Sequence, residues 1–315
     1  MTGASGVRIG WTDLPREVRS AVETILGGAV VDAVSQPGGF SPGTADRVRT
    51  SDGRRAFVKA VSPAQNEQSP DMHRREAWVT AALPASVPAP GLLGRYDDGE
   101  WVALVLEDVE GRHPVTPWRA DELDRVLATL TELAESLTPA PLDDLRTATD
   151  LLTEDFGAWR RIAADPPADL DPWTTRHLTD LCALADRGLE ALDGDTLVHT
   201  DIRADNLLVG ADGTVTVVDW PWACRGAAWL DRLLLLINVR LFGGHDTEAL
   251  LDHCAVTTSA DPDDLTAALA GIGGFFVEAG RRPPPKGIPT VRAFQRAQGD
   301  AVLSWLRERH AVARA

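Results

Sequence analysis

The stretch LVHTDIRADNLLVGADGTVTVVDWPWA, residues 197–223, constrains the fold most, because it mixes strand-like apolar runs with many polar side chains. The polar side chains are His199, Asp201, Arg203, Asp205, Asn206 and Asp219. A charged group is costly to bury in a strand unless it is paired or binds a ligand. The stretch therefore predicts a functional site built on a turn and a β-hairpin.

The hairpin is predicted from Asp212-Gly213, a dipeptide typical of two-residue turns between strands. With this turn centre, Asn206 lies directly opposite Asp219, and paired residues of antiparallel strands share a face. A four-residue turn from Gly210 to Gly213 would shift this register. Either way an amide oxygen and a carboxylate come together, and hard oxygen ligands are those that Mg²⁺ takes in phosphoryl transfer.

Asp201 lies five residues before Asn206, in the turn that leads into the first of these strands. A carboxylate at this position is suited to orient an attacking hydroxyl and accept its proton. Arg203 offers a fixed positive fork to a moving phosphate, and His199 is expected to organise the loop. A carboxylate that caps a helix or a turn is the alternative for any single acid.

The motif HTDIRADNLL followed by VVDWPWA resembles the aminoglycoside phosphotransferase family, the small-molecule branch of the protein-kinase-like fold, which also includes choline-kinase-like enzymes. The resemblance covers most of the chain from about residue 30. It implies that Asp201 is the catalytic base and that Asn206 and Asp219 bind Mg²⁺. It also implies that Asp231 braces the catalytic loop by accepting backbone N–H bonds; a solvated surface acid is the alternative.

The segments around this motif predict a small β-rich lobe followed by a larger helical lobe. Strands are expected at 29–36, 44–50, 56–61 and 101–109, and helices at 14–26 and 69–83. Leucines at helical spacing follow residue 111, and 227–242 predicts a buried helix. The segment VPAPGLLGRYDDG, residues 87–99, is interpreted as turn-rich. The expected organisation is an α/β (α+β) two-lobe kinase-like fold with a nucleotide-binding lobe at 1–106, a hinge at 107–112 and a helical lobe at 113–315.

Lys59 stands in the middle of the strand AFVKAV, and Glu76 follows it by 17 residues on the next helix. A mid-strand lysine also protects exposed sheet edges from aggregation. The family resemblance implies instead that Lys59 holds the α- and β-phosphates and that Glu76 orients it. Glu67 and Asp71 are the competing acids. Both lie at or before the start of this helix, for which Ser69 is the expected N-cap, and capping or stabilisation of the helix dipole explains acids there.

Two further segments complete the expected nucleotide site. The turn GGFSPG, residues 38–43, would fold over the phosphates and offer N–H groups from Gly39, Phe40, Ser41 and Gly43. It departs from the usual G-x-G-x-x-G pattern, and Pro42 supplies no N–H. The segment VLEDVEG, residues 105–111, resembles the hinge, where the backbone of Glu107 and Val109 would meet the purine.

Charge and cysteine content exclude several other classes of protein. The formal net charge of −16 disfavours a nucleic-acid partner and favours a cationic ligand or simply solubility. Three scattered cysteines predict neither a disulfide framework nor a zinc site, and they suit a reducing cytoplasm. No apolar run is long enough to span a membrane.

The sequence thus predicts a phosphotransferase that moves the γ-phosphate of ATP or GTP, with Mg²⁺, to a hydroxyl of a small molecule. The expected acceptor is aminoglycoside-like or otherwise carries amines, and the chain is expected to be a cytoplasmic monomer or homodimer. Two alternatives stay open. One is a metabolite kinase acting on choline, a sugar or an amino-alcohol; the other is an inactive scaffold that binds nucleotide.

Overall fold

The computed structural model describes residues 7–40, 42–258 and 260–312. The chain divides into two compact units. The first contains residues 1–114, 205–222 and 284–291, and the second contains residues 115–204, 223–283 and 292–315. The hairpin that carries Asn206 and Asp219 therefore packs with the N-terminal unit, although it lies late in the sequence. Each unit is described by itself below.

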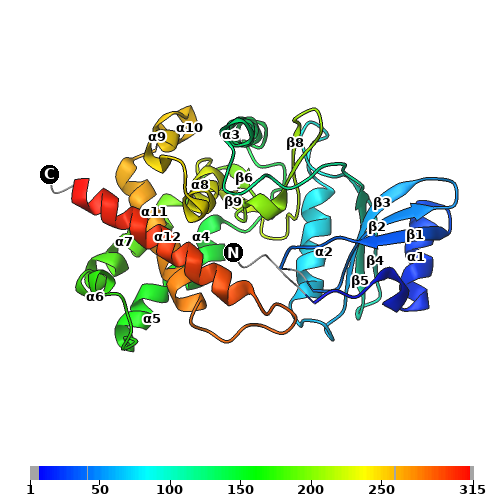
Figure 1. Ribbon diagram of the computed structural model, residues 1–315, viewed down its shortest axis with the longest axis horizontal. Coiled ribbons are helices and arrows are strands. Elements are labelled where there is room, and N and C mark those ends of the chain that lie inside the picture. Colours follow the sequence, from blue (N-terminus) through cyan, green and yellow to red (C-terminus); the bar gives the residue numbers. More distant parts are fainter. Residues whose placement is uncertain (1–6, 41, 259, 313–315) are drawn as a thin grey trace. The chain divides into compact units, whose positions relative to one another are not determined.

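The first unit is built on a five-stranded antiparallel sheet with the order β1-β2-β3-β5-β4 (Figure 1). The strands are β1 (Val30–Ser35), β2 (Thr44–Thr50), β3 (Arg55–Val61), β4 (Leu92–Asp97) and β5 (Val102–Glu107). Helix α1 (Arg16–Leu26), preceded by the short helix η1 (Trp11–Asp13), covers one face of the sheet. Helix α2 (Ser69–Thr80) covers the other.

Strand alternation decides which side chains meet each helix. On β3, Ala56, Val58 and Ala60 are fully buried in the apolar cluster beneath α1. Phe57 packs in the cluster beneath α2. Lys59 shares the face of Phe57, as strand alternation predicts, so the lysine points toward α2.

Two details of this unit differ from the prediction. The segment interpreted as turn-rich contains β4, whose residues are alternately half-buried and exposed and which forms one edge of the sheet. The expected N-cap of α2, Ser69, is instead its first helical residue. Asn66 takes the capping role, because its side-chain oxygen accepts from the N–H groups of Gln68 (3.0 Å) and Ser69 (3.2 Å).

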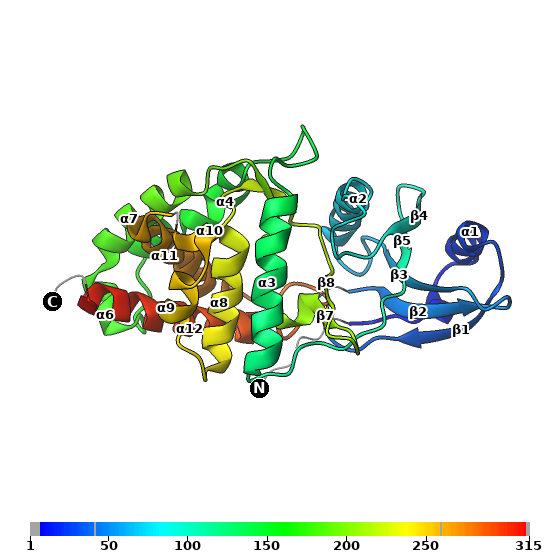
Figure 2. The same ribbon diagram turned by 90° about the horizontal axis from the view of Figure 1, so that it is seen from above.

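The second unit is mostly helical. Its helices are α3 (Ala120–Ser136), α4 (Ala148–Phe156), α5 (Ala158–Ala164), α6 (Pro172–Arg176), α7 (Leu178–Ala191), α8 (Leu230–Phe242), α9 (Thr247–Asp252), α10 (Ala255–Thr258), α11 (Pro262–Ala279) and α12 (Val291–Val312), whose first residue belongs to the first unit. The predicted leucine helices and the buried helix correspond to α3, α7 and α8. Figure 2 shows α3 running beside α8. In the described part of the chain no helix is long and apolar enough to cross a membrane.

Small residues let α7 and α11 approach closely. A Cβ at Gly188 would lie 2.3 Å from the carbonyl oxygen of Ala267, so only glycine fits at this contact. Trp159 of α5 donates from its indole nitrogen to the carbonyl oxygen of Ala270 at 2.7 Å. Removing its indole would therefore leave both a cavity and an unpaired carbonyl group.

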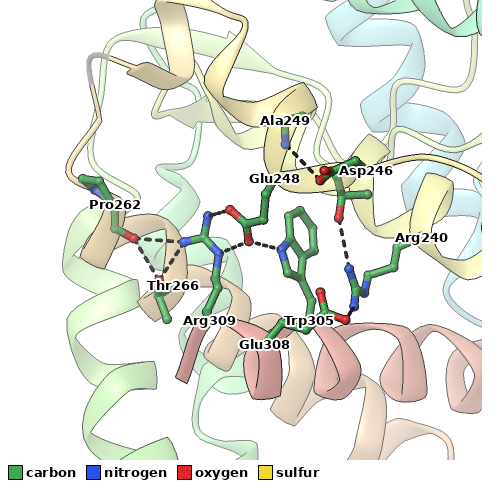
Figure 3. Close-up of polar contacts among 10 residues, drawn as sticks. Arg240, Asp246, Glu248, Ala249, Pro262, Thr266, Trp305, Glu308 and Arg309 are labelled. Carbon is green, nitrogen blue, oxygen red and sulfur yellow. Dashed lines mark hydrogen bonds and ion pairs between the residues drawn. The ribbon is translucent and has the colours of Figure 1, made fainter. Parts of the chain in front are cut away.

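Polar contacts fasten the C-terminal helix α12 to α9 and α11 (Figure 3). Glu248 accepts from the guanidinium of Arg309 at 2.7 and 2.9 Å and from the indole nitrogen of Trp305. Arg309 also donates to the hydroxyl of Thr266 at 2.7 Å and to the carbonyl oxygen of Pro262 at 3.1 Å. One guanidinium thus joins three helices.

Asp155, near the end of α4, should make stability depend on pH. Burial raises the pKa of Asp155 to about 6, although Arg282 and Arg161 oppose the shift. Since the folded state then binds more protons than the unfolded chain, stability should fall as the pH rises from about 4 to 6. We expect the decrease in the free energy of unfolding between these pH values to be about 1–2 kcal/mol smaller in Asp155→Asn than in the wild type. Urea unfolding at several pH values measures this difference. An equal slope in Asp155→Asn and the wild type would contradict it, and Asp143→Asn, at an exposed loop position, is the control.

Candidate active site

An ion-pair cluster lies on the α2 face of the first unit. The ammonium of Lys59 is 2.7 and 2.8 Å from the two carboxylate oxygens of Glu76 and 2.7 Å from a carboxylate oxygen of Asp219. Glu76 is 2 % exposed, and it also accepts from the backbone N–H of Trp220. The strand, the helix and the hairpin therefore bring together three residues, of which Lys59 and Asp219 are 160 positions apart in the chain.

Burial and neighbouring charge act against each other on this cluster. Burial raises the pKa of the Glu76 carboxyl, and the Lys59 ammonium opposes that shift. Burial alone would lower the pKa of Lys59, but the carboxylates of Asp219 and Glu76 outweigh it and raise the value to about 12. Lys59 is therefore a permanent cation at neutral pH. His73, one turn before Glu76 on α2, stays neutral, because burial and the charge of Lys59 lower its pKa to about 3.

The hairpin register differs from the predicted one. Strand β7 (Leu207–Val209) pairs with β8 (Val215–Val217) with Leu207 opposite Val217, so Asn206 lies opposite Val218 and not opposite Asp219. The N–H of Val218 donates to the carbonyl oxygen of Asn206 at 3.0 Å. The reason is a turn one residue longer than the predicted Asp212-Gly213 turn: the N–H of Gly210 donates to the carbonyl oxygen of Thr214 at 2.8 Å. Asp219 still follows directly after the residue paired with Asn206.

The donor chemistry of Asn206 and Asp219 fits Mg²⁺. Asp219 has φ of 71°, a conformation that non-glycine residues rarely adopt and that functional sites often retain. Its carboxylate is about one-third exposed, whereas Asn206 is buried. No group of three or more His, Cys, Asp or Glu side chains among the described residues is arranged to hold a metal. A metal here would depend on these two oxygen donors together with water and phosphate, a ligand set typical of Mg²⁺.

The glycine turn is only partly as predicted. Gly38, Gly39 and Gly43 have φ of 90°, 74° and 91°, and a Cβ at Gly43 would lie 2.4 Å from the carbonyl oxygen of Ala60. Gly43 was expected to offer its N–H to a phosphate, but that N–H donates to the carbonyl oxygen of Val7 at 3.3 Å. The positive φ and the close approach to Ala60 explain why position 43 is a glycine. Among the other predicted contacts, Gly39 and Phe40 lie in the turn, and Ser41 lies outside the described residues.

The predicted hinge residues lie at and after the end of β5. The N–H of Glu107 donates to the carbonyl oxygen of Gly91 at 2.9 Å, and the carbonyl oxygen of Val109 accepts from Arg47. Between them Asp108, with a side chain only 3 % exposed, pairs with Arg47 at 3.0 Å and Arg55 at 2.6 Å. Sequence reasoning missed this brace, because neither arginine belongs to a motif.

The second unit carries the loop with His199, Asp201 and Arg203, which follows β6 (Thr196–Val198). Asp231 of α8, 6 % exposed, accepts from the N–H groups of His199 (2.7 Å) and Thr200 (2.8 Å), so the predicted brace is confirmed. Thr200 has φ of 62°, a strained value for a β-branched residue, and these two bonds hold it there.

Side-chain contacts order the rest of this loop. The ring nitrogen Nδ1 of His199 accepts from the N–H of Asp201 at 3.2 Å, and the ring is fully buried. Arg203 is paired with the Asp201 carboxylate and lies over the ring of Phe294, with its guanidinium carbon 5.8 Å from the ring centre. His199 thus organises the turn, and the carboxylate of Asp201 is held in place by a neighbouring cation.

Asp231→Asn tests the brace. The amide keeps one acceptor and turns its other end, an N–H₂ group, toward a backbone N–H. We expect a loss of about 2–4 kcal/mol in the free energy of unfolding, measured by chemical denaturation. Asp252→Asn, at an exposed position on α9, is the matched control. Equal stability of both variants would contradict the bracing role.

Comparisons with known proteins show the family and the fold of the chain. Residues 38–267 match the model of the phosphotransferase enzyme family. No curated protein matches the chain. Among solved structures, choline kinase LicA from Streptococcus pneumoniae has 15% identity and a TM-score of 0.61, covering 92% of this chain and 98% of that chain.

Two aminoglycoside phosphotransferases are also similar in fold. A thermostable mutant of APH(4)-Ia, in a ternary complex with ADP and hygromycin B, has 15% identity and a TM-score of 0.58, covering 91% of this chain and 98% of that chain. The enzyme from Alicyclobacillus acidocaldarius has 16% identity and a TM-score of 0.53, with coverages of 94% and 96%. These neighbours confirm the predicted kinase-like fold. With the family match over most of its length, the chain belongs to the phosphotransferase enzyme family.

Proposed function

We propose that the protein transfers the γ-phosphate of ATP to a hydroxyl group of a small molecule. The observation that carries this proposal is the position of the Lys59 ammonium, which lies 2.7 Å from carboxylate oxygens of both Glu76 and Asp219 on the α2 face of the sheet. A cation fixed in this way between two acids is suited to bind the phosphates of a nucleotide. An inactive scaffold is disfavoured, since Asp201, Asn206 and Asp219 are all present.

In the proposed reaction the acceptor oxygen attacks the γ-phosphorus while its proton passes to the carboxylate of Asp201. The bond from this phosphorus to the oxygen bridging the β- and γ-phosphates breaks, and ADP leaves. Lys59 binds phosphate oxygens, and Arg203 stabilises charge on the moving group. Asn206 and Asp219 would hold Mg²⁺, which supplies charge neutralisation when bound. Gly39, Phe40 and Ser41 are proposed to cover the phosphates, and Glu107 and Val109 to adjoin the base.

We propose an amine-bearing acceptor. The net charge of −16 favours cationic ligands, and one structural neighbour is a complex with hygromycin B. Not every acid is available, however. Asp261, Asp263 and Asp264, near the start of α11, all pair with Arg187 at 2.8–3.4 Å. A metabolite kinase is the second candidate, favoured by the fold similarity to a choline kinase.

Release of ADP in the presence of Mg²⁺ and ATP, over a panel of aminoglycosides, choline, amino-alcohols and neutral sugars, tests the proposal. Acceptor-dependent ADP would support a kinase. Nucleotide binding without ADP release for any acceptor would favour the scaffold alternative.

The salt dependence of the Michaelis constant tests the charge of the acceptor. For an amine-bearing acceptor we expect KM to rise with salt while kcat changes little, because salt screens attraction beyond about 8 Å at physiological ionic strength. A neutral acceptor from the same panel is the control and should show almost no trend. A flat KM for the best acceptor, or a best acceptor that is neutral or anionic, would overturn the cationic class and favour the metabolite kinase.

A further inference from the structure

The N-terminal segment is bound to the glycine turn by its main chain. The N–H of Ile9 donates to the carbonyl oxygen of Gly43 at 3.3 Å, and the N–H of Gly43 donates to Val7 at 3.3 Å. The N–H of Val7 in turn donates to the carbonyl oxygen of Gly287 at 2.8 Å. Arg8, between these contacts, forms an isolated parallel bridge with Gly43. Its backbone is therefore fixed on both sides at the end of the turn.

The side chain of Arg8 lies against the glycines of the turn. Its Nη2 donates to the carbonyl oxygen of Gly38 at 2.8 Å, and a Cβ at Gly39 would lie 3.2 Å from the same nitrogen. The half-buried guanidinium interacts electrostatically with Asp219 and with Asp46. A second cation thus acts on Asp219, the carboxylate that already binds Lys59.

This arrangement also changes which donors the turn can offer. Pro42 has no N–H, and the N–H of Gly43 is used by the N-terminal segment. The N-terminal segment that binds the N–H of Gly43 also brings the guanidinium of Arg8 to the turn. A guanidinium binds phosphate oxygens through two parallel N–H groups, and it is more strongly directional than an ammonium.

We propose that Arg8 is a phosphate-binding residue of the nucleotide site, and that it acts with Lys59 on the outer phosphates of the nucleotide. The assignment rests on the proposed function, because it takes a nucleoside triphosphate as the ligand. Asp46, which is buried and accepts from the hydroxyl of Ser35, also interacts electrostatically with the guanidinium. The outer phosphates are the relevant ones, since Asp219 would hold a Mg²⁺ ion, which would neutralise their charge when bound.

Calorimetric binding of MgATP, MgADP, AMP and inorganic tripolyphosphate to Arg8→Gln tests this assignment. We expect affinity for MgATP and tripolyphosphate to fall about 10- to 100-fold, as for the loss of a charge-assisted pair of hydrogen bonds. Affinity for AMP should change less than about twofold. Arg8→Lys, which keeps the charge and loses the fork, should lie between the two. Arg16→Gln, at an exposed position on α1, makes the same change in charge and should match the wild type.

The other outcomes separate the two proposals. Equal weakening for ATP and AMP, or a lower melting temperature in Arg8→Lys as well as Arg8→Gln, would assign Arg8 to folding of the turn. Unchanged or tighter ATP binding in Arg8→Gln, with the wild type binding normally, would overturn only the role of Arg8. A wild type that binds tripolyphosphate in an Arg8-dependent way but not ATP would retain the anion site and reject the nucleotide. Binding of neither ligand would reject both.

Discussion

Asp201→Asn should lower kcat by about 10²-fold or more while folding and nucleotide binding stay close to those of the wild type. The amide has the same shape and still offers an oxygen to Arg203, but it cannot take the proton of an attacking hydroxyl. The turn itself is held by other groups, namely the ring of His199 and the carboxylate of Asp231. Single-turnover and steady-state ADP release at saturating ATP and acceptor would measure the effect.

The control for this variant is Asp143→Asn, which makes the same chemical change at an exposed loop position. The melting temperatures of both variants, with and without MgATP, show whether the loop has stayed folded. Turnover near that of the wild type in Asp201→Asn would reject its assignment as the base. Loss of the MgATP-induced stabilisation would instead indicate that Asp201 acts through nucleotide binding.

What the sequence predicts well are features set by short-range spacing. The alternation of AFVKAV places Lys59 on the face of Phe57, and Glu76, which the family resemblance implies as its partner, lies 2.7 Å away. The apolar surroundings of Asp231 predict a buried acid, and its two N–H bonds confirm this. In both cases the local pattern restricts which face of the element the side chain lies on, whereas its partner was implied by the family resemblance.

What the sequence did not predict depends on backbone detail or on contacts distant in the chain. One residue more or less in a turn changes the partner of Asn206 from Asp219 to Val218, and both turns suit the residues 210–213. Strand β4 was not predicted, because the prolines and glycines around it made the segment resemble a series of turns. Arg8 belongs to no motif, and its electrostatic interaction with Asp219 depends on how the N-terminal segment pairs with Gly43.

Asp219→Asn should have opposite effects on metal-free and metal-bound nucleotide. Asparagine tolerates the positive φ of this position better than alanine, so the backbone is kept while the charge is removed. Without the carboxylate, Lys59 and Arg8 lose a partner that competes with phosphate. We therefore expect ATP without Mg²⁺ to bind at least as tightly as to the wild type, MgATP to bind more weakly, and Mg²⁺-dependent turnover to be abolished.

Two further variants make the Asp219→Asn result specific to the metal. Asn206→Ala removes a neutral ligand and should weaken MgATP more mildly, whereas Glu76→Gln frees Lys59 from its partner on α2 and should weaken ATP with and without Mg²⁺ alike. Melting temperatures at saturating ATP, with Mg²⁺ or with a chelator, separate these patterns. If MgATP raises the melting temperature of Asp219→Asn as much as that of the wild type, the metal is bound elsewhere and Asp219 is not needed for MgATP binding. If instead only the increment due to Mg²⁺ disappears, the carboxylate is the metal ligand, because a residue that merely positioned Lys59 would affect both forms of the nucleotide equally.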